Sequence, residues 1–162
     1  MGDVMKVLVL FAASLCLQAS VSFAETYSFK HPVSMSGYTE EECKAENLEW
    51  NSEGYCVIND VADTVVIAKP KKYYKVNVET ITTNAHQCSF EATNGKLVNS
   101  RKLVSSQPST IYKDNKPIAS KCVVTVNYND NNSVSVTTNG YEECAEFCGA
   151  NASLEIEKAI KE

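Results

Sequence analysis

The chain has 162 residues, a formal net charge of −5 and seven cysteines. This length suits one ordinary domain with its own hydrophobic core. The negative charge argues against nucleic acid as a partner, because binding phosphates requires an excess of Lys and Arg. After the first residues, no window approaches the ~20 apolar residues of a membrane-spanning helix, so no membrane span is expected.

The first 24 residues have the three parts of a secretory signal peptide. Lys6 supplies the positive charge, Val7 to Leu17 form the apolar region, and Ser22-Phe23-Ala24 is a cleavage site with small residues. We therefore predict a signal peptide over residues 1–24 and a single mature domain over residues 25–162, located in the periplasm or the secreted medium.

Removing this signal peptide also removes Cys16 and leaves an even number of cysteines, as expected in an oxidising compartment. An acylated Cys16, as in a lipoprotein, is the alternative, but Leu15 is not the small residue that normally precedes such a cysteine. We expect six cysteines in disulfides: Cys43, Cys56, Cys88, Cys122, Cys144 and Cys148. The short interval predicts a local bridge between Cys43 and Cys56. For the other four we favour crossed links that tie Cys88 and Cys122 to the C-terminal pair.

The N-terminal part of the mature chain, residues 25–60, shows no regular period and is expected to be an irregular subregion. It contains one helix signal, because Thr39 followed by Glu42 is a capping box. We predict a short helix from Glu40 to Leu48.

From residue 61 onward, β-branched residues and a period of two indicate strands, followed by a C-terminal segment rich in cysteine. Along one strand, Cys122, Val124, Val126 and Tyr128 share a face that we assign to the core. The fold class is mainly β, a small antiparallel β-sandwich or barrel with short helices, stapled by disulfides. The predicted strands are Thr64 to Ala68, Tyr73 to Thr80, Gln87 to Ala92, Lys96 to Leu103, Cys122 to Tyr128 and Ser133 to Thr137.

The segments between the predicted strands contain residues typical of turns, loops and helices. Asn94-Gly95 predicts a two-residue hairpin turn, and Asn129 to Asn132 predicts a second turn. The polar segment Ser105 to Ser120 contains two prolines and is expected to be a long loop. Glu142 to Phe147 and Leu154 to Lys161 are predicted to be helical, the latter from charge pairs three and four residues apart.

The C-terminal pattern Cys144-Ala-Glu-Phe-Cys148-Gly-Ala-Asn-Ala resembles that of small secreted bacterial proteins ending in a cysteine pair followed by Gly-Ala-x-Ala. The resemblance runs from Cys88 to about Leu154. Some proteins of this build look like periplasmic lysozyme inhibitors, which are compact antiparallel β-folds that push a polar loop into the hydrolase cleft. Their Ser-Gly-x-Tyr loop motif has an imperfect counterpart in Ser36-Gly37-Tyr38, which lacks the intervening residue.

The sequence contains few residues in patterns typical of a catalytic or metal site. Only His31 and His86 could act as a histidine base, and neither lies in a recognisable catalytic motif. The three-residue spacing of Cys144 and Cys148 does not match a zinc site or a redox pair. Acidic residues at 40–42 and 142–146 could in principle form a carboxylate pair for glycoside hydrolysis, but clusters of this kind usually face solvent. We therefore expect no enzyme activity, no catalytic residues, no metal and no cofactor.

Two segments are candidate binding sites. The first is the loop with Ser34, Ser36, Gly37 and Tyr38, which would contact an envelope or secreted protein and, in the sharpest form of the hypothesis, inhibit a lysozyme-like hydrolase. The second is a basic run interleaved with aromatics, which would bind an anionic polymer in a structural or glycan-binding component of the envelope. A simpler interpretation is that these lysines protect an exposed strand edge from aggregation. The run consists of Lys69, Lys71, Lys72, Tyr73, Tyr74 and Lys75.

Overall fold

The computed structural model describes residues 23–130, 132–149 and 151–162. The predicted signal peptide lies outside the described residues except for Phe23 and Ala24, and so does Cys16. The strands are β1 (Ala24–Met35), β2 (Glu49–Trp50), β3 (Cys56–Ala68), β4 (Tyr74–Thr82), β5 (His86–Asn99), β6 (Lys102–Lys113), β7 (Lys116–Tyr128), β8 (Ser133–Thr138) and β9 (Ile156–Lys161). The helices are α1 (Glu40–Ala45) and α2 (Tyr141–Cys144), with 3₁₀ turns η1 (Thr83–Ala85) and η2 (Ala145–Phe147).

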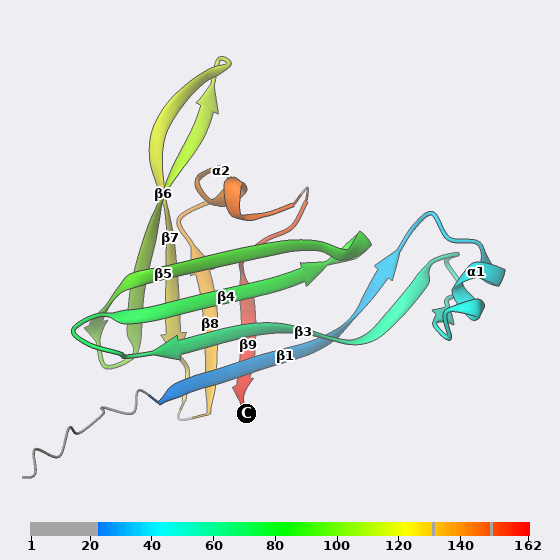
Figure 1. Ribbon diagram of the computed structural model, residues 1–162, viewed down its shortest axis with the longest axis horizontal. Helices are drawn as coiled ribbons and strands as arrows, with labels where there is room; N and C mark the ends of the chain where they lie inside the picture. The colour runs from blue at the N-terminus through cyan, green and yellow to red at the C-terminus, as the bar shows by residue number, and fades with distance from the viewer. Residues whose placement is uncertain (1–22, 131, 150) are drawn as a thin grey trace, which may run out of the picture.

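The sheet closes on itself. Strands β3 to β9 pair antiparallel with their neighbours in chain order, and β1 pairs with both β3 and β9. Every strand except β2 therefore belongs to a closed ring. In Figure 1 this ring is flattened into two layers, with β1, β3, β4 and β5 crossing over β6 to β9. The predicted fold class, a mainly β antiparallel protein with short helices and disulfides, is confirmed.

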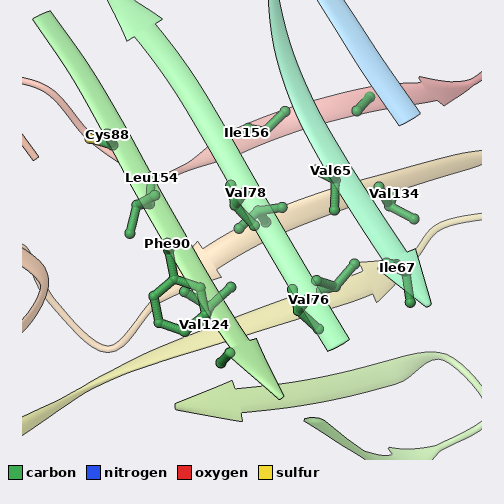
Figure 2. Close-up of a cluster of buried hydrophobic side chains, with 14 of the residues drawn as sticks. Val65, Ile67, Val76, Val78, Cys88, Phe90, Val124, Val134, Leu154 and Ile156 are labelled. Carbon is green, nitrogen blue, oxygen red and sulfur yellow. The ribbon is translucent and has the colours of Figure 1, made fainter. Parts of the chain in front are cut away.

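The core lies between the two layers. Val76 and Val78 of β4 and Phe90 of β5 are fully buried and face Val124 of β7, as Figure 2 shows. The alternation predicted along β7 is confirmed for Cys122, Val124 and Val126, whereas Tyr128 at the strand end is only half-buried. Branched side chains at alternate positions fill this interlayer space because each strand turns every second residue inward.

The N-terminal part is not irregular as predicted, because β1 is a twelve-residue strand. Its sequence shows little apolar alternation since only Tyr27 and Val33 are buried. Beyond the barrel, β1 and β3 continue as a two-stranded ribbon that carries α1 at its end (Figure 1). Helix α1 has the predicted capping box: Glu42 N donates to Thr39 Oγ1 at 3.2 Å, and Thr39 N donates to Glu42 Oε2 at 2.8 Å. The helix ends at Ala45, before the predicted Leu48.

The predicted loop from Ser105 to Ser120 is also wrong, because the segment forms the hairpin of β6 and β7. Pro108 and Pro117 lie where these strands extend beyond their other neighbours, so their missing N–H groups interrupt no second ladder. The tip residues Asp114 and Asn115 have positive φ angles of 51° and 60°, as a tight two-residue turn requires.

The predicted C-terminal helix is a strand, β9. Its buried residues Ile156 and Ala159 are three apart, which looks helical in sequence. In the structure they pair with Val136 and Val134 of β8, across a register shift that places an extra residue in β9. The other predicted helix, Glu142 to Phe147, is confirmed as α2 and η2.

Three disulfides join parts of the chain that the sheet does not hold. Cys43–Cys56 ties α1 to the start of β3, as predicted. Cys88–Cys148 and Cys122–Cys144 tie β5 and β7 to the C-terminal segment, so each strand cysteine has the kind of partner that was expected. The two links are nested along the chain and not crossed. Gly149 N donates to Gln87 O at 2.8 Å beside the first of them, and a Cβ on Gly149 would lie 3.3 Å from the His86 ring.

The contact that closes the ring between β1 and β9 is short. Only Tyr27 and Ser28 pair there, with Lys161 and Ile160. The Lys161 ammonium lies 2.6 Å from Glu25 Oε1, and this hydrogen bond and charge lower the pKa of Glu25. Tyr27 donates to the other Glu25 oxygen at 3.2 Å, and burial of its ring raises the Tyr27 pKa to about 12. A cavity of about 330 Å³ opens beside this closure.

Removing the longest-range disulfide should cost the most stability. The chain-entropy argument gives ~4 kcal/mol for the 60-residue separation of Cys88 and Cys148, against ~3 kcal/mol for the 13-residue separation of Cys43 and Cys56. We expect Cys88→Ala/Cys148→Ala to lower the free energy of unfolding more than Cys43→Ala/Cys56→Ala does. Urea unfolding of both variants measures the two losses. A larger loss in Cys43→Ala/Cys56→Ala would contradict this expectation.

Alkaline stability should report on Tyr27. Because its folded pKa of about 12 exceeds the ordinary value near ~10, the folded state retains this proton longer than the unfolded state. Its contribution to stability is complete below pH ~10 and is lost as the pH rises toward the folded pKa. We expect Tyr27→Phe to flatten the fall in unfolding free energy over this window, whereas the exposed-site control Tyr112→Phe should leave the slope as in the wild type. An unchanged slope in Tyr27→Phe would refute the assignment.

Candidate functional site

A basic and aromatic surface lies where the β3–β4 turn meets β5. Lys69 and Lys72 come from the turn, Tyr73 and Tyr74 lead into β4, and Lys96 comes from β5. Together with Leu97 they line an open cavity of about 440 Å³. We call this set of residues the basic surface: Lys69, Lys72, Tyr73, Tyr74, Lys96 and Leu97.

The ammonium groups of the basic surface lie over the two tyrosine rings. Lys69 Nζ is 5.0 Å from the ring centre of Tyr74. Lys72 Nζ and Lys96 Nζ are 5.4 Å and 5.5 Å from the ring centre of Tyr73. These distances are within the range of cation–π attraction, which positions an ammonium group without neutralising its charge.

Gly95 makes this arrangement possible. Tyr74 pairs with Gly95, and the register then shifts before Val76 pairs with Ala92. A Cβ on Gly95 would lie 2.9 Å from the Tyr74 carbonyl oxygen, so only glycine allows the two strands to approach this closely. The glycine thereby places Lys96 beside Tyr73.

The predicted hairpin turn at Asn94-Gly95 is therefore wrong, and β5 runs through it. The Asn94 side chain replaces missing ladder bonds between β5 and β6: it donates to Ser106 O at 2.8 Å and accepts from Ser106 N at 3.1 Å. The turn lies at residues 100–101, where Arg101 N donates to Asn99 Oδ1 at 2.8 Å. The strand predicted from Lys96 to Leu103 is accordingly divided between β5 and β6.

Charge is segregated along the segments of the sequence that build this surface. Segments 64–78 and 92–112 contain no Asp or Glu, yet they hold seven of the chain's 15 basic residues. Lys75 differs from its neighbours because it pairs with Glu91 at 2.9 Å. Lys71 is exposed in the β3–β4 turn. The basic run predicted from sequence is thus brought together in part, while Lys96 and Leu97 were missed because they are distant in sequence.

The lysines do not protect an open strand edge. At this end of the sheet β3 pairs with β1 and β4, and β4 pairs with β3 and β5. Both strands are therefore covered on both sides, which removes the simpler interpretation of the basic run.

The other predicted site, the loop after β1, lies at the opposite end of β3. Ser34 does not lie in the loop as predicted but in β1, where it pairs with Val57, whereas the β3–β4 turn follows Ala68. Asn84 Oδ1 accepts hydrogen bonds from Ser36 N at 2.6 Å and from Ser36 Oγ at 2.9 Å, so the loop is anchored to η1. Gly37 has a φ of 88°, and Tyr38 is exposed.

A third surface was missed because its segment was predicted to be a loop. The β6–β7 hairpin projects beyond the two layers in Figure 1 and exposes 73% of Tyr112. Glu146 of η2 supports it by accepting from Thr110 N at 2.9 Å. The only sequence signal was the polar pair Asp114-Asn115, which suits a tight turn.

The two histidines lie beside groups that belong to the sheet. His31 Nε2 lies 3.2 Å from Asp63 Oδ1, and the same oxygen accepts from Ile81 N at 2.8 Å, which links β1, β3 and β4. His86 is the first residue of β5. In residues 23–130, 132–149 and 151–162, no group of three or more His, Cys, Asp or Glu residues could hold a metal ion.

The described part of the chain contains no helix that is both long and apolar enough to span a bilayer. Comparisons of the sequence with protein-family models and with curated proteins, and of the chain with solved structures, give no match.

Proposed function

We propose that the protein is a non-enzymatic binding protein of the periplasm or the secreted medium, and that it binds an anionic component of the cell envelope. The observation that carries this proposal is the basic surface, where three ammonium groups lie over two tyrosine rings beside a cavity whose lining contains no Asp or Glu. Three disulfides support an extracytoplasmic location, because such bonds persist in oxidising compartments.

The geometry suits an extended anion with several charges. A single exposed ion pair contributes only ~0.2–1 kcal/mol, so one ammonium group would bind weakly. Three ammonium groups that converge on one cavity can engage several charges of the same ligand, and their effects multiply in the binding constant. The exposed Tyr73 ring adds a flat apolar platform between Lys72 and Lys96.

The histidine surroundings support a binding role over a catalytic one. The Asp63 oxygen nearest His31 already accepts a backbone hydrogen bond from Ile81 and so has a structural task that holds β3 to β4. The basic surface itself is built from Lys, Tyr and Leu. Its lysines remain over aromatic rings that position them, which is an arrangement for holding a ligand.

Sedimentation with cell-envelope fragments tests this proposal. We expect the wild type to sediment with the fragments, and Lys69→Gln/Lys72→Gln/Lys96→Gln to bind at least ~10-fold more weakly, since three contacts of ~0.5 kcal/mol are lost. The matched control Lys113→Gln/Lys116→Gln/Lys121→Gln makes the same charge change on the β6–β7 hairpin and should bind like the wild type. Equal losses in both triple variants would show a net-charge effect and contradict the proposed site.

Inhibition of a lysozyme-like hydrolase by the loop at residues 34–38 is a second candidate function. It is favoured by the anchoring of Ser36 to Asn84 and by the nearby Cys43–Cys56 bridge, because a loop held in one conformation loses little entropy on binding. The resemblance of the C-terminal cysteine segment to secreted inhibitor-like proteins belongs to the same proposal.

Titration of the oxidised protein against a panel of lysozymes tests the second candidate. We expect inhibition at micromolar concentration that Tyr38→Ala weakens, because Tyr38 is the exposed aromatic of the loop. Tyr112→Ala on the distant hairpin is the control and should inhibit like the wild type. Absence of inhibition across the panel would rule out this function.

A further inference from the structure

Two exposed aliphatic side chains adjoin the basic surface. Leu97 is 44% exposed and Val98 is 64% exposed, although they are consecutive residues of β5. Neighbouring residues of a strand point to opposite faces, so both can be exposed only where the strand end stands clear of the core. This end of β5 leads into the turn at residues 100–101.

Lys96 connects the two faces of this strand end. It lines the cavity of about 440 Å³ with Leu97, and a second cavity of about 320 Å³ with Val98 and Val104. The aliphatic side chains therefore lie on either side of a lysine and not on a separate patch. Arg101 and Lys102 come after the turn residue Ser100 and are exposed.

We infer that the anionic partner is a lipid surface, with the basic surface against the headgroups and with Leu97 and Val98 entering the boundary of the acyl chains. This inference rests on the proposed function and names its ligand. Charge complementarity favours this partner: the β3–β4 turn presents Lys69, Lys71 and Lys72, and the adjoining ends of β5 and β6 present Lys96 and Lys102. Arg101 lies between them but shares a cavity with Glu25 and Asp130, so the lysines carry the positive charge of this surface. Each basic residue close to an anionic leaflet strengthens the attachment.

A lipid surface explains the aliphatic residues better than a glycan does. Sugar hydroxyls need hydrogen-bonding partners, which Leu and Val lack, whereas transfer of these side chains out of water into lipid is favourable. Peripheral membrane proteins combine the same two features, basic residues and inserted apolar side chains. Tyr73, which is 38% exposed beside the lysines, has the amphipathic ring typical of the headgroup region.

The charge distribution would also orient the molecule on such a surface. The chain is net acidic, and Glu40, Glu41 and Glu42 of α1 lie at the opposite end of β3 from the basic surface. Figure 1 shows α1 and the β3–β4 turn at opposite ends of the front layer. An anionic surface therefore attracts one end and repels the other.

Vesicle sedimentation tests the inference. We expect the full disulfide-bonded protein to bind vesicles of equal parts phosphatidylcholine and phosphatidylglycerol, and not vesicles of phosphatidylcholine alone. Leu97→Ser/Val98→Ser should lower the partition coefficient by ~10-fold, since two partly exposed aliphatic groups no longer insert. The matched control Tyr112→Ser/Ile118→Ser removes two exposed apolar residues from the β6–β7 hairpin and should partition like the wild type.

Purified peptidoglycan sacculi form the second arm and separate the two proposals. If the protein binds sacculi in a way that depends on the lysines, and does not bind anionic vesicles, the lipid inference is overturned and the proposed function stays intact. Equal binding to neutral and anionic vesicles, or unchanged partition of Leu97→Ser/Val98→Ser, would also overturn it. If neither material binds in a way that depends on Lys69, Lys72 and Lys96, both proposals fail. Unfolding curves of each variant exclude a loss through misfolding.

Discussion

Closure of the ring by β1 is the constraint on which the rest of the structure depends. Strands β3 to β9 pair in chain order, so only β1 joins the first and last parts of the sheet. It does so unevenly, with a long ladder to β3 and two residue pairs to β9. The ion pair of Glu25 with Lys161 and the buried ring of Tyr27 reinforce the short side. Because β1 covers β3, and β5 covers β4, these two strands have no open edge beside the basic surface.

The disulfides fix two parts of the chain that the hydrogen bonds of the ring do not fix. Helix α1 and the C-terminal segment with α2 lie outside the ladders, and each is joined to a strand by a bridge with buried sulfur. Short elements of this kind have little stability of their own. Cross-linking them to β3, β5 and β7 limits their freedom in the unfolded chain and keeps both ends of the molecule in one arrangement.

Sequence reasoning succeeded where the physical signal is local. The capping box at Thr39, the short Cys43–Cys56 loop and the alternation along Cys122 to Val126 each depend on neighbours in the chain, and each is confirmed. It failed where residues distant in the sequence determine the local structure. The three-residue spacing of Ile156 and Ala159 reflects a bulge against β8, and Asn94-Gly95 joins two neighbouring strands by side-chain bonds and close approach. Four of the six residues of the basic surface were visible in the run from Lys69 to Tyr74, but the contribution of Lys96 follows only from the β4–β5 pairing.

The contrast between Lys75 and its neighbours bears on what the basic surface is for. Within the described residues, Lys75 of β4 has an acidic partner in Glu91, whereas the ion pairs found there do not include Lys69, Lys72 or Lys96. Positive charges gathered in this way repel one another and lower the stability of the folded protein. An acidic neighbour at the same place would raise that stability. The tyrosine rings hold these ammonium groups in place without cancelling their charge. This retained positive charge, beside exposed Leu97 and Val98, is the reason for proposing an anionic and partly apolar partner for the basic surface.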